Sequence, residues 1–147
     1  MKFAMNSKIL QWNCRGLKAN FEEMQLLIDS ESPVAVCLQE TFLKNTDVLS
    51  FRGYSTYSKT VDSAERASGG VTVLVKSGIP HEPVPLQTPL QATAVKISLH
   101  KTITCCSLYL PPGTPVNPVD LENLFDQLPR PYILLGDFNA HNTMWGF

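Results

Sequence analysis

The sequence predicts an α/β fold in which mixed strands are flanked by helices, and three patterns along the chain indicate it. An amphipathic helix joins two short apolar strands within residues 8–39. Strands rich in β-branched residues and bounded by turns follow within residues 54–109. A second amphipathic helix then leads to a last apolar strand at residues 132–135. Strands and helices in this order are typical of a layered α/β domain.

The composition is that of an ordinary globular protein. The chain has 147 residues, 44% of them hydrophobic, and its 12 Lys and Arg residues against 13 Asp and Glu residues give a net charge of −1. A chain of this length buries roughly 70% of the surface that its unfolded form exposes, so we expect one domain over residues 1–147. These values exclude a disordered chain, a collagen-like repeat and binding to nucleic acid by overall charge alone.

The first part of the chain is predicted to form a strand, a helix and a second strand. Residues 8–13 form the first strand, and we expect Asn20 to cap the helix in a capping box with Glu23. Residues 34–39 have the apolar character of a buried central strand. This order predicts a right-handed crossover between neighbouring strands. The apolar residues expected to bury one face of the helix are Phe21, Met24, Leu27 and Ile28.

Turn-forming residues divide the rest of the chain. Strands are expected over residues 54–59, 70–75, 92–98 and 102–109, and the polar segment 60–69 is predicted to be an exposed connection. The proline-rich residues 80–89 are predicted to be a loop, because proline lacks the N–H that a central strand needs. A second helix is indicated by the helical spacing of Leu121, Leu124, Phe125 and Leu128.

The sequence predicts an intracellular protein. The first eight residues contain no apolar segment of the kind found in signal peptides, and no apolar run approaches the ~20 residues that span a bilayer. We therefore expect no membrane partner. The cysteines lack C-x-x-C spacing and are expected to be buried thiols in a reducing compartment; they are Cys14, Cys37, Cys105 and Cys106.

Polar side chains occur where several apolar strands stop. Asn13 ends the first strand, Glu40 follows the second, and Asp137 and Asn139 follow the last. Strand ends in an α/β sheet are rigid and meet at one edge, where ligand sites form. Carboxylates at two such ends can hold Mg²⁺, which takes oxygen ligands and typically one or two protein carboxylates. Neighbouring amides can donate hydrogen bonds to a phosphate.

Each of these residues also has an ordinary structural interpretation. Glu40 can be the first exposed residue after a buried strand, and Asn13 can bond its own backbone in the following turn. Asp137 and Asn139 both favour turns. Tyr109, which ends another predicted strand, can be a core residue. Their common position at strand ends favours a functional site.

Short motifs occur in a characteristic order along the chain. They are Gln11-Trp-Asn-Cys-Arg-Gly-Leu17, Leu38-Gln-Glu-Thr41, Ser68-Gly-Gly-Val71, Tyr109-Leu-Pro-Pro112 and Gly136-Asp-Phe-Asn139. This series resembles the successive motifs of the endonuclease/exonuclease/phosphatase superfamily. The resemblance spans Ile9 to Gly146 and is closest to the endonuclease domain of LINE-type (non-LTR) retrotransposons.

The resemblance implies a two-layer β-sandwich with helices outside, the DNase-like four-layer fold. It also implies cleavage of phosphodiesters with Mg²⁺, or with Mn²⁺ as the alternative ion. By this resemblance, Glu40 is the main metal ligand, with Asn13 beside it at the metal and the phosphate. Asp137 orients and activates the attacking water, Asn139 binds the scissile phosphate, and Tyr109 places its hydroxyl on that phosphate.

The implied substrate is duplex DNA, nicked to leave a 3′-hydroxyl that primes reverse transcription. A reverse transcriptase domain in a longer parent protein and a nuclear location follow from the same resemblance.

The resemblance also predicts a missing element. The family's last catalytic element is an Asp-His pair that follows Ser on a further strand, and only the residues after Asn139 remain to supply it. We therefore expect a domain that is truncated after the Gly-Asp-Phe-Asn motif, with His141 in the next loop and not a counterpart of that pair. An inactive remnant or a binding module of the same fold is the alternative. A phosphatase or phospholipase of the same superfamily is a weaker one.

Overall fold

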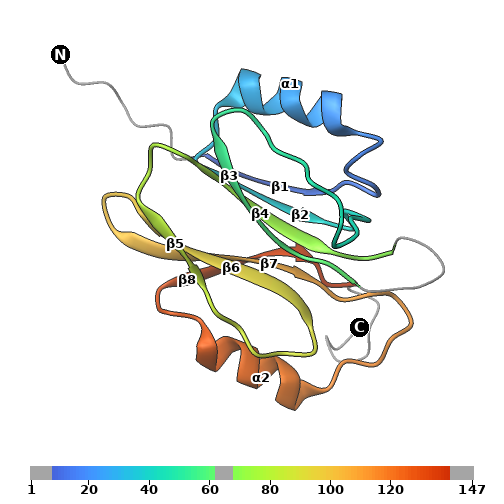
Figure 1. Cartoon of the computed structure of the whole chain (residues 1–147). Coiled ribbons are helices and arrows are strands. Elements are labelled where there is room, and N and C mark those ends of the chain that lie inside the picture. The colour runs from blue at the N-terminus through green and yellow to red at the C-terminus, as the bar shows by residue number, and fades with distance from the viewer. Residues whose placement is uncertain (1–7, 62–67, 140–147) are drawn as a thin grey trace.

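Two four-stranded sheets packed face to face form the centre of the computed structural model, which describes residues 8–61 and 68–139. The strand orders are β1-β2-β4-β3 in one sheet and β5-β6-β7-β8 in the other. Helix α1 (Phe21–Glu31) covers the outer face of the first sheet, and α2 (Pro118–Gln127) covers the outer face of the second (Figure 1). The predicted sandwich flanked by helices is therefore confirmed.

The first sheet contains the predicted strand–helix–strand unit. Its strands are β1 (Ile9–Asn13), β2 (Ala35–Gln39), β3 (Tyr54–Lys59) and β4 (Val71–Lys76). Strands β1 and β2 are parallel, whereas β4 is antiparallel to both β2 and β3. The register places Asn13 opposite Gln39 and Gln39 opposite Val71, so these strands all reach the same end of the sheet.

The second sheet contains β5 (His81–Val84), β6 (Gln91–Ser98), β7 (Thr102–Tyr109) and β8 (Tyr132–Asp137). Its antiparallel pairs are β5–β6 and β6–β7, and β8 pairs in parallel with β7. The register places Gln91 opposite Tyr109 and Tyr109 opposite Asp137. These three residues therefore share one end of the second sheet.

Apolar side chains fill the space between the sheets and beneath each helix. The cluster between the sheets consists of Val34, Ala35, Cys37, Val73, Val75, Val95, Ile97 and Cys105. Helix α1 buries Met24 and Ile28, and α2 buries Leu121 and Leu124. All four cysteines are buried free thiols, as expected. Leu27, which we expected to be buried, is 41% exposed.

The predicted capping box at the start of α1 is wrong. The side chain of Asn20 makes no hydrogen bond to the helix. Its Nδ2 instead donates to the carbonyl oxygens of Cys14 (2.8 Å) and Gly16 (2.9 Å). The turn after β1 leaves these carbonyls without strand partners, and the Asn20 amide satisfies them.

The prediction that residues 80–89 form a loop is wrong for its first half. His81–Val84 is strand β5, which pairs with β6 and, among the described residues, forms an edge of its sheet. Proline is tolerated on an edge strand because its missing N–H faces away from the ladder. Pro83 therefore lies opposite Val95 without disrupting the sheet.

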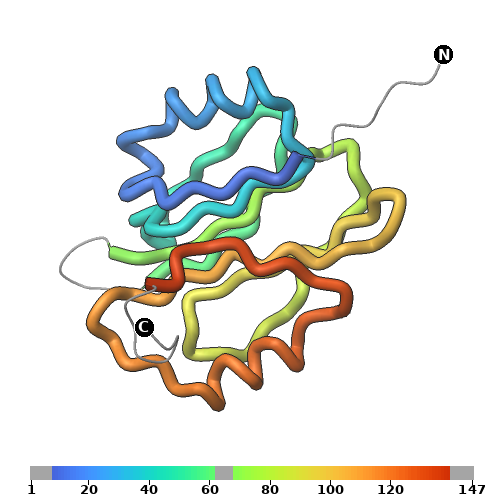
Figure 2. Tube along the Cα trace, turned by 180° about the vertical axis from the view of Figure 1, so that it is seen from behind, coloured from blue at the N-terminus to red at the C-terminus, as the bar shows by residue number. Residues whose placement is uncertain are grey.

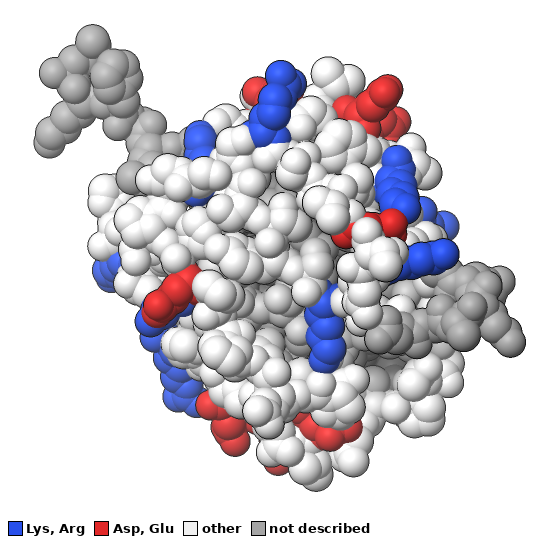
Figure 3. Space-filling model, in the orientation of Figure 1, with Lys and Arg blue, Asp and Glu red and all other residues white. Residues whose placement is uncertain are grey.

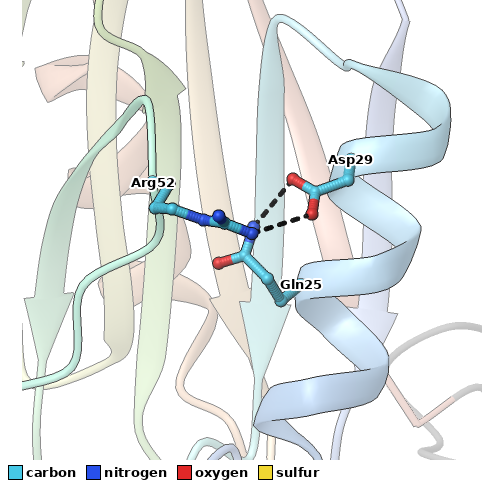
Figure 4. Close-up of polar contacts among 3 residues, drawn as sticks. All are labelled: Gln25, Asp29 and Arg52. Carbon is cyan, nitrogen blue, oxygen red and sulfur yellow. Dashed lines mark hydrogen bonds and ion pairs between the residues drawn. The ribbon is translucent and has the colours of Figure 1, made fainter.

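An exposed ion pair joins α1 to the segment before β3. Arg52 Nη2 lies 3.3 Å from Asp29 Oδ2, and Gln25 Nε2 donates to Asp29 Oδ1 at 2.9 Å (Figure 4). Such exposed pairs contribute little stability, typically ~0.2–1 kcal/mol.

Some predictions fall outside the part of the chain that the structure describes. They concern the centre of the connection 60–69, and His141 with the residues that follow it. Within residues 8–61 and 68–139, neither helix has the length and apolar character needed to cross a bilayer.

Candidate active site

The predicted site residues meet at one end of the sandwich. Strands β1 and β8 belong to different sheets but run side by side along the same border of the molecule (Figure 2). At their ends, Asn13 Nδ2 donates a hydrogen bond of 3.0 Å to Asp137 Oδ2. Glu40 and Tyr109 lie beside this pair, and the charges of Glu40 and Asp137 both act on the Tyr109 hydroxyl. The structure thus brings together residues that are far apart in the sequence.

Asn13 contributes an oxygen atom with no partner. Its Oδ1 is buried and accepts no hydrogen bond from any residue in the described part of the chain. An unpaired buried oxygen is costly in a folded protein unless a ligand or an ion satisfies it. Because this oxygen belongs to the side chain that bonds Asp137, it lies within the carboxylate site.

Glu40 is held in a strained backbone conformation directly after β2. Its φ is 51°, in the left-handed region that non-glycine residues rarely adopt. The segment is fixed on two sides, since Gly16 N donates to Glu40 O (2.8 Å) and Phe42 N donates to Gly69 O (2.9 Å). Strain of this kind is found where a structure must aim a functional side chain.

Most other left-handed residues also lie around the site. The exception is Ser32, which has a positive φ at the end of α1, as is common at helix ends. The other non-glycine residues with positive φ in residues 8–61 and 68–139 lie around the strand ends described above; they are Arg15, Glu40, Phe42 and Asn139.

Tyr109 is 6% exposed, and the charges of both carboxylates act on its hydroxyl. Burial, the negative charge of Glu40 and the hydrogen bond to that carboxylate raise the pKa of Tyr109 to about 12. The charge of Asp137 acts in the same direction, and Arg15 opposes it. The hydroxyl is therefore protonated at neutral pH and serves as a hydrogen-bond donor.

Asn139 orients Asp137 through its backbone. Asn139 N donates to Asp137 Oδ1 at 3.2 Å, so each oxygen of that carboxylate accepts a hydrogen bond. The Asn139 side chain bonds elsewhere, with Nδ2 donating to Leu110 O.

A buried polar bridge behind the site was not predicted from the sequence. Gln39, fully buried, donates through Nε2 to Ser107 Oγ (3.0 Å) and to Leu135 O (3.3 Å). Its Oε1 accepts from Gln11 Nε2 at 2.6 Å. The bridge connects β2 to both β7 and β8 immediately before Glu40. In the sequence, the glutamine at the end of an otherwise apolar strand is the one feature that could have indicated this bridge.

A cleft of about 410 Å³ opens beside Glu40 and Tyr109. Its lining residues are Glu40, Phe42, Ser68, Gly69, Gln91, Tyr109 and Pro111. Basic and acidic residues are interspersed on the face shown in Figure 3, with wide neutral areas between them. That face therefore carries no extended basic surface among the described residues.

The oxygen donors at the site fit a hard cation. The carboxylates of Glu40 and Asp137 and the unpaired Oδ1 of Asn13 are all oxygen ligands. No group of three or more His, Cys, Asp or Glu side chains that could hold a metal occurs in the described segments. This set suits Mg²⁺, which uses one or two carboxylates and fills its other positions with water and substrate oxygens. It suits zinc less well, because zinc sites in proteins usually include histidine or cysteine ligands.

A model of the endonuclease/exonuclease/phosphatase family matches residues 10–147 of this chain. The chain belongs to that family. The RNA-directed DNA polymerase from mobile element jockey of Drosophila funebris is 30% identical to this family member over 95% of the chain. The corresponding jockey protein of Drosophila melanogaster is 29% identical. The chain spans only 15% of the length of each of these relatives.

Solved structures of the family share the fold. The endonuclease domain of TRAS1, a telomere-specific non-LTR retrotransposon, has a TM-score of 0.72 and 23% identity, covering 95% of this chain and 62% of that one. A family protein from Leptotrichia buccalis has a TM-score of 0.64 and 15% identity, covering 94% of this chain and 70% of that one. The predicted resemblance to retrotransposon endonucleases and the DNase-like fold are both confirmed.

Proposed function

We propose that this chain is the endonuclease part of a non-LTR retrotransposon protein and nicks duplex DNA with Mg²⁺. The observation that carries the proposal is the joining of Asn13 and Asp137 beside Glu40 and Tyr109 in a member of this family. The relatives support it, because their names place them in mobile elements and call them RNA-directed DNA polymerases. The same proposal includes a longer parent protein that also contains a reverse transcriptase domain and that acts on DNA in the nucleus.

Glu40 and Asn13 Oδ1 would hold the cation. A bound Mg²⁺ supplies Lewis-acid stabilisation of the charge that develops on the phosphate, and Mn²⁺ is the alternative ion. Asn13 can take this role because its Oδ1 has no other partner in the described chain, while its Nδ2 donates to Asp137.

Asp137 would orient the attacking water and take up its proton. The hydrogen bonds from Asn13 Nδ2 and Asn139 N fix the plane of the carboxylate, which leaves its remaining lone pairs for water. A carboxylate held in this way aligns the nucleophile without moving during the reaction.

Tyr109 and Asn139 would bind the scissile phosphate. Tyr109, with its pKa raised to about 12, would turn its single O–H from Glu40 to a phosphate oxygen as negative charge builds up there. Asn139 Nδ2 gives one proton to Leu110 O and keeps a second one for the phosphate.

A plasmid-nicking assay tests the proposal. Supercoiled DNA incubated with the wild-type chain and Mg²⁺ should become open-circular, and EDTA should stop this conversion. Glu40→Gln should lower the rate by at least about 100-fold, while Glu122→Gln, the same change on the exposed face of α2, should leave it unchanged. Absence of nicking by the folded wild-type chain would contradict the proposal and favour the binding-module alternative.

A further inference from the structure

The cleft beside Glu40 contains a polar side chain that the proposed reaction does not use. We propose that Gln91 donates a hydrogen bond to a phosphate of the DNA strand next to the cleaved bond, which makes the cleft a subsite for the flanking nucleotide. This inference rests on the proposed function and specifies how the same site holds its substrate.

Gln91 lies within reach of a substrate bound at the carboxylates. It begins β6 directly opposite Tyr109 on β7, and it lines the cleft together with Glu40 and Tyr109. A phosphodiester that contacts Tyr109 therefore has its neighbouring nucleotide beside Gln91.

The carboxamide of Gln91 has a fixed orientation. Its Oε1 accepts a hydrogen bond of 2.7 Å from Gly70 N, across the space between the two sheets. The Nε2 group donates to no acceptor in the described part of the chain, which leaves both of its protons for a ligand. An oriented donor without a partner binds at little cost in conformational freedom.

The surroundings of Gln91 hold it in place. A Cβ atom on Gly69 would lie 2.4 Å from Gln91 Oε1, so the close approach depends on glycine at position 69, where φ is +59°. On the other side, Lys59 Nζ donates to the carbonyl oxygens of Thr88 (2.9 Å) and Leu90 (2.6 Å). These bonds fix the backbone that leads into β6.

The chemistry of the cleft suits a phosphodiester. The residues around Gln91 offer carboxylate, tyrosine and apolar groups, with Phe42 and Pro111 as apolar walls for a sugar. Much of protein–DNA hydrogen bonding goes to phosphate oxygens, and neutral amides take part in it. Since the net charge is −1, neutral donors must supply part of the affinity that basic residues supply in other DNA-binding proteins.

Gln91→Glu separates a ligand-binding role from a structural one. The new carboxylate keeps an acceptor for Gly70 N but replaces the donor with a negatively charged oxygen. We expect the Kd for a short duplex, measured by fluorescence anisotropy in EDTA, to rise at least about tenfold. KM for nicking should rise similarly with little change in kcat, and the thermal midpoint should match that of the wild type. Gln87→Glu, an equal charge change on the exposed segment before β6, is the control and should bind as the wild type does.

The outcomes distinguish this inference from the proposed function. Equal Kd values for Gln91→Glu and the wild type would overturn it, as would an equal weakening by Gln91→Glu and Gln87→Glu, which would indicate charge alone. A wild-type chain that binds no duplex would overturn it as well. A wild-type chain that binds DNA but does not nick it would contradict the proposed function, and the binding measurements would still decide the role of Gln91.

Discussion

Asn13 and Asp137 are joined by a 3.0 Å hydrogen bond although 124 positions separate them in the sequence. Asn13 ends β1 in one sheet and Asp137 ends β8 in the other. The bond therefore forms only when both sheets have assembled, so the site exists only in the fully folded protein. The bond joins a neutral amide to a carboxylate, so a second negative charge in place of the amide would make this contact depend on a bound cation.

Asn13→Asp should make the stability of the protein depend on a divalent cation. In EDTA the new carboxylate faces Asp137 and replaces a hydrogen bond with repulsion, which should lower the free energy of unfolding by about 1–3 kcal/mol. Mg²⁺ should restore more of the stability of this variant than it adds to the wild type. Urea unfolding with EDTA and with Mg²⁺ measures both effects, and equal stability of the variant and the wild type in EDTA would contradict the interpretation.

The Gln39–Ser107 bridge should show energetic coupling. Gln39→Leu should destabilise the protein by about 2 kcal/mol, because it leaves the buried Ser107 hydroxyl and the Leu135 carbonyl short of a donor. Ser107→Ala removes one partner of the same bridge. A double-mutant cycle from chemical denaturation should give a coupling energy of about 1 kcal/mol. Strictly additive effects would mean that the two side chains act independently.

Gly136→Ala should be strongly destabilising. A Cβ atom at this position in β8 would lie 1.7 Å from the carbonyl oxygen of Leu108, and a strand backbone cannot yield by that much. We expect a loss of about 3 kcal/mol in the free energy of unfolding, at the upper end of what overpacking usually costs. Gly78→Ala is the matched control, since nothing lies within 4 Å of a Cβ there. A similar stability for both variants in thermal and urea denaturation would rule out this role for the close strand contact.

The buried thiols should react slowly in the native state and make the protein sensitive to alkaline pH. Burial raises the pKa of Cys105 to about 11 and that of Cys106 to about 12, from the usual value of 9.0. Well below pH 9 the thiols are protonated in both the folded and the unfolded chain. Above it, the unfolded chain loses these protons first, so stability should fall as the pH rises from about 9 to 12. Thiol labelling at pH 8 with and without urea, and urea midpoints at increasing pH, measure these effects. Rapid labelling of the native protein would contradict the burial of these cysteines.

Local patterns in the sequence were enough to place three candidate site residues at strand ends, where the structure has them. Asn13 and Asp137 end β1 and β8, and Glu40 follows β2, because the end of a strand is visible in the sequence of that strand. The partners that cross between the sheets were not predictable. The bond from Gly70 to Gln91 depends on how the two sheets are stacked, which no local pattern specifies.

Competition for hydrogen bonds explains the local errors. Asn20 is a residue type that caps helices with its side-chain oxygen, but its Nδ2 donates to the carbonyls of Cys14 and Gly16, and that orientation leaves its Oδ1 without a cap bond. Pro83 excludes a central strand, whereas its place on an edge strand depends on the order of strands in the finished sheet.

The left-handed backbone at Glu40 and Phe42 has a consequence for the history of such genes. Glycine adopts this conformation without strain, so replacing either residue with glycine would relax the backbone while removing a group from the site. Under the proposed function, a gene copy no longer selected for cleavage can accept glycine at these positions, whereas a copy under selection must keep the strained side chains. Aligned genes for this family can therefore be sorted, at these two positions, into those that keep the strained side chains and those that have lost them.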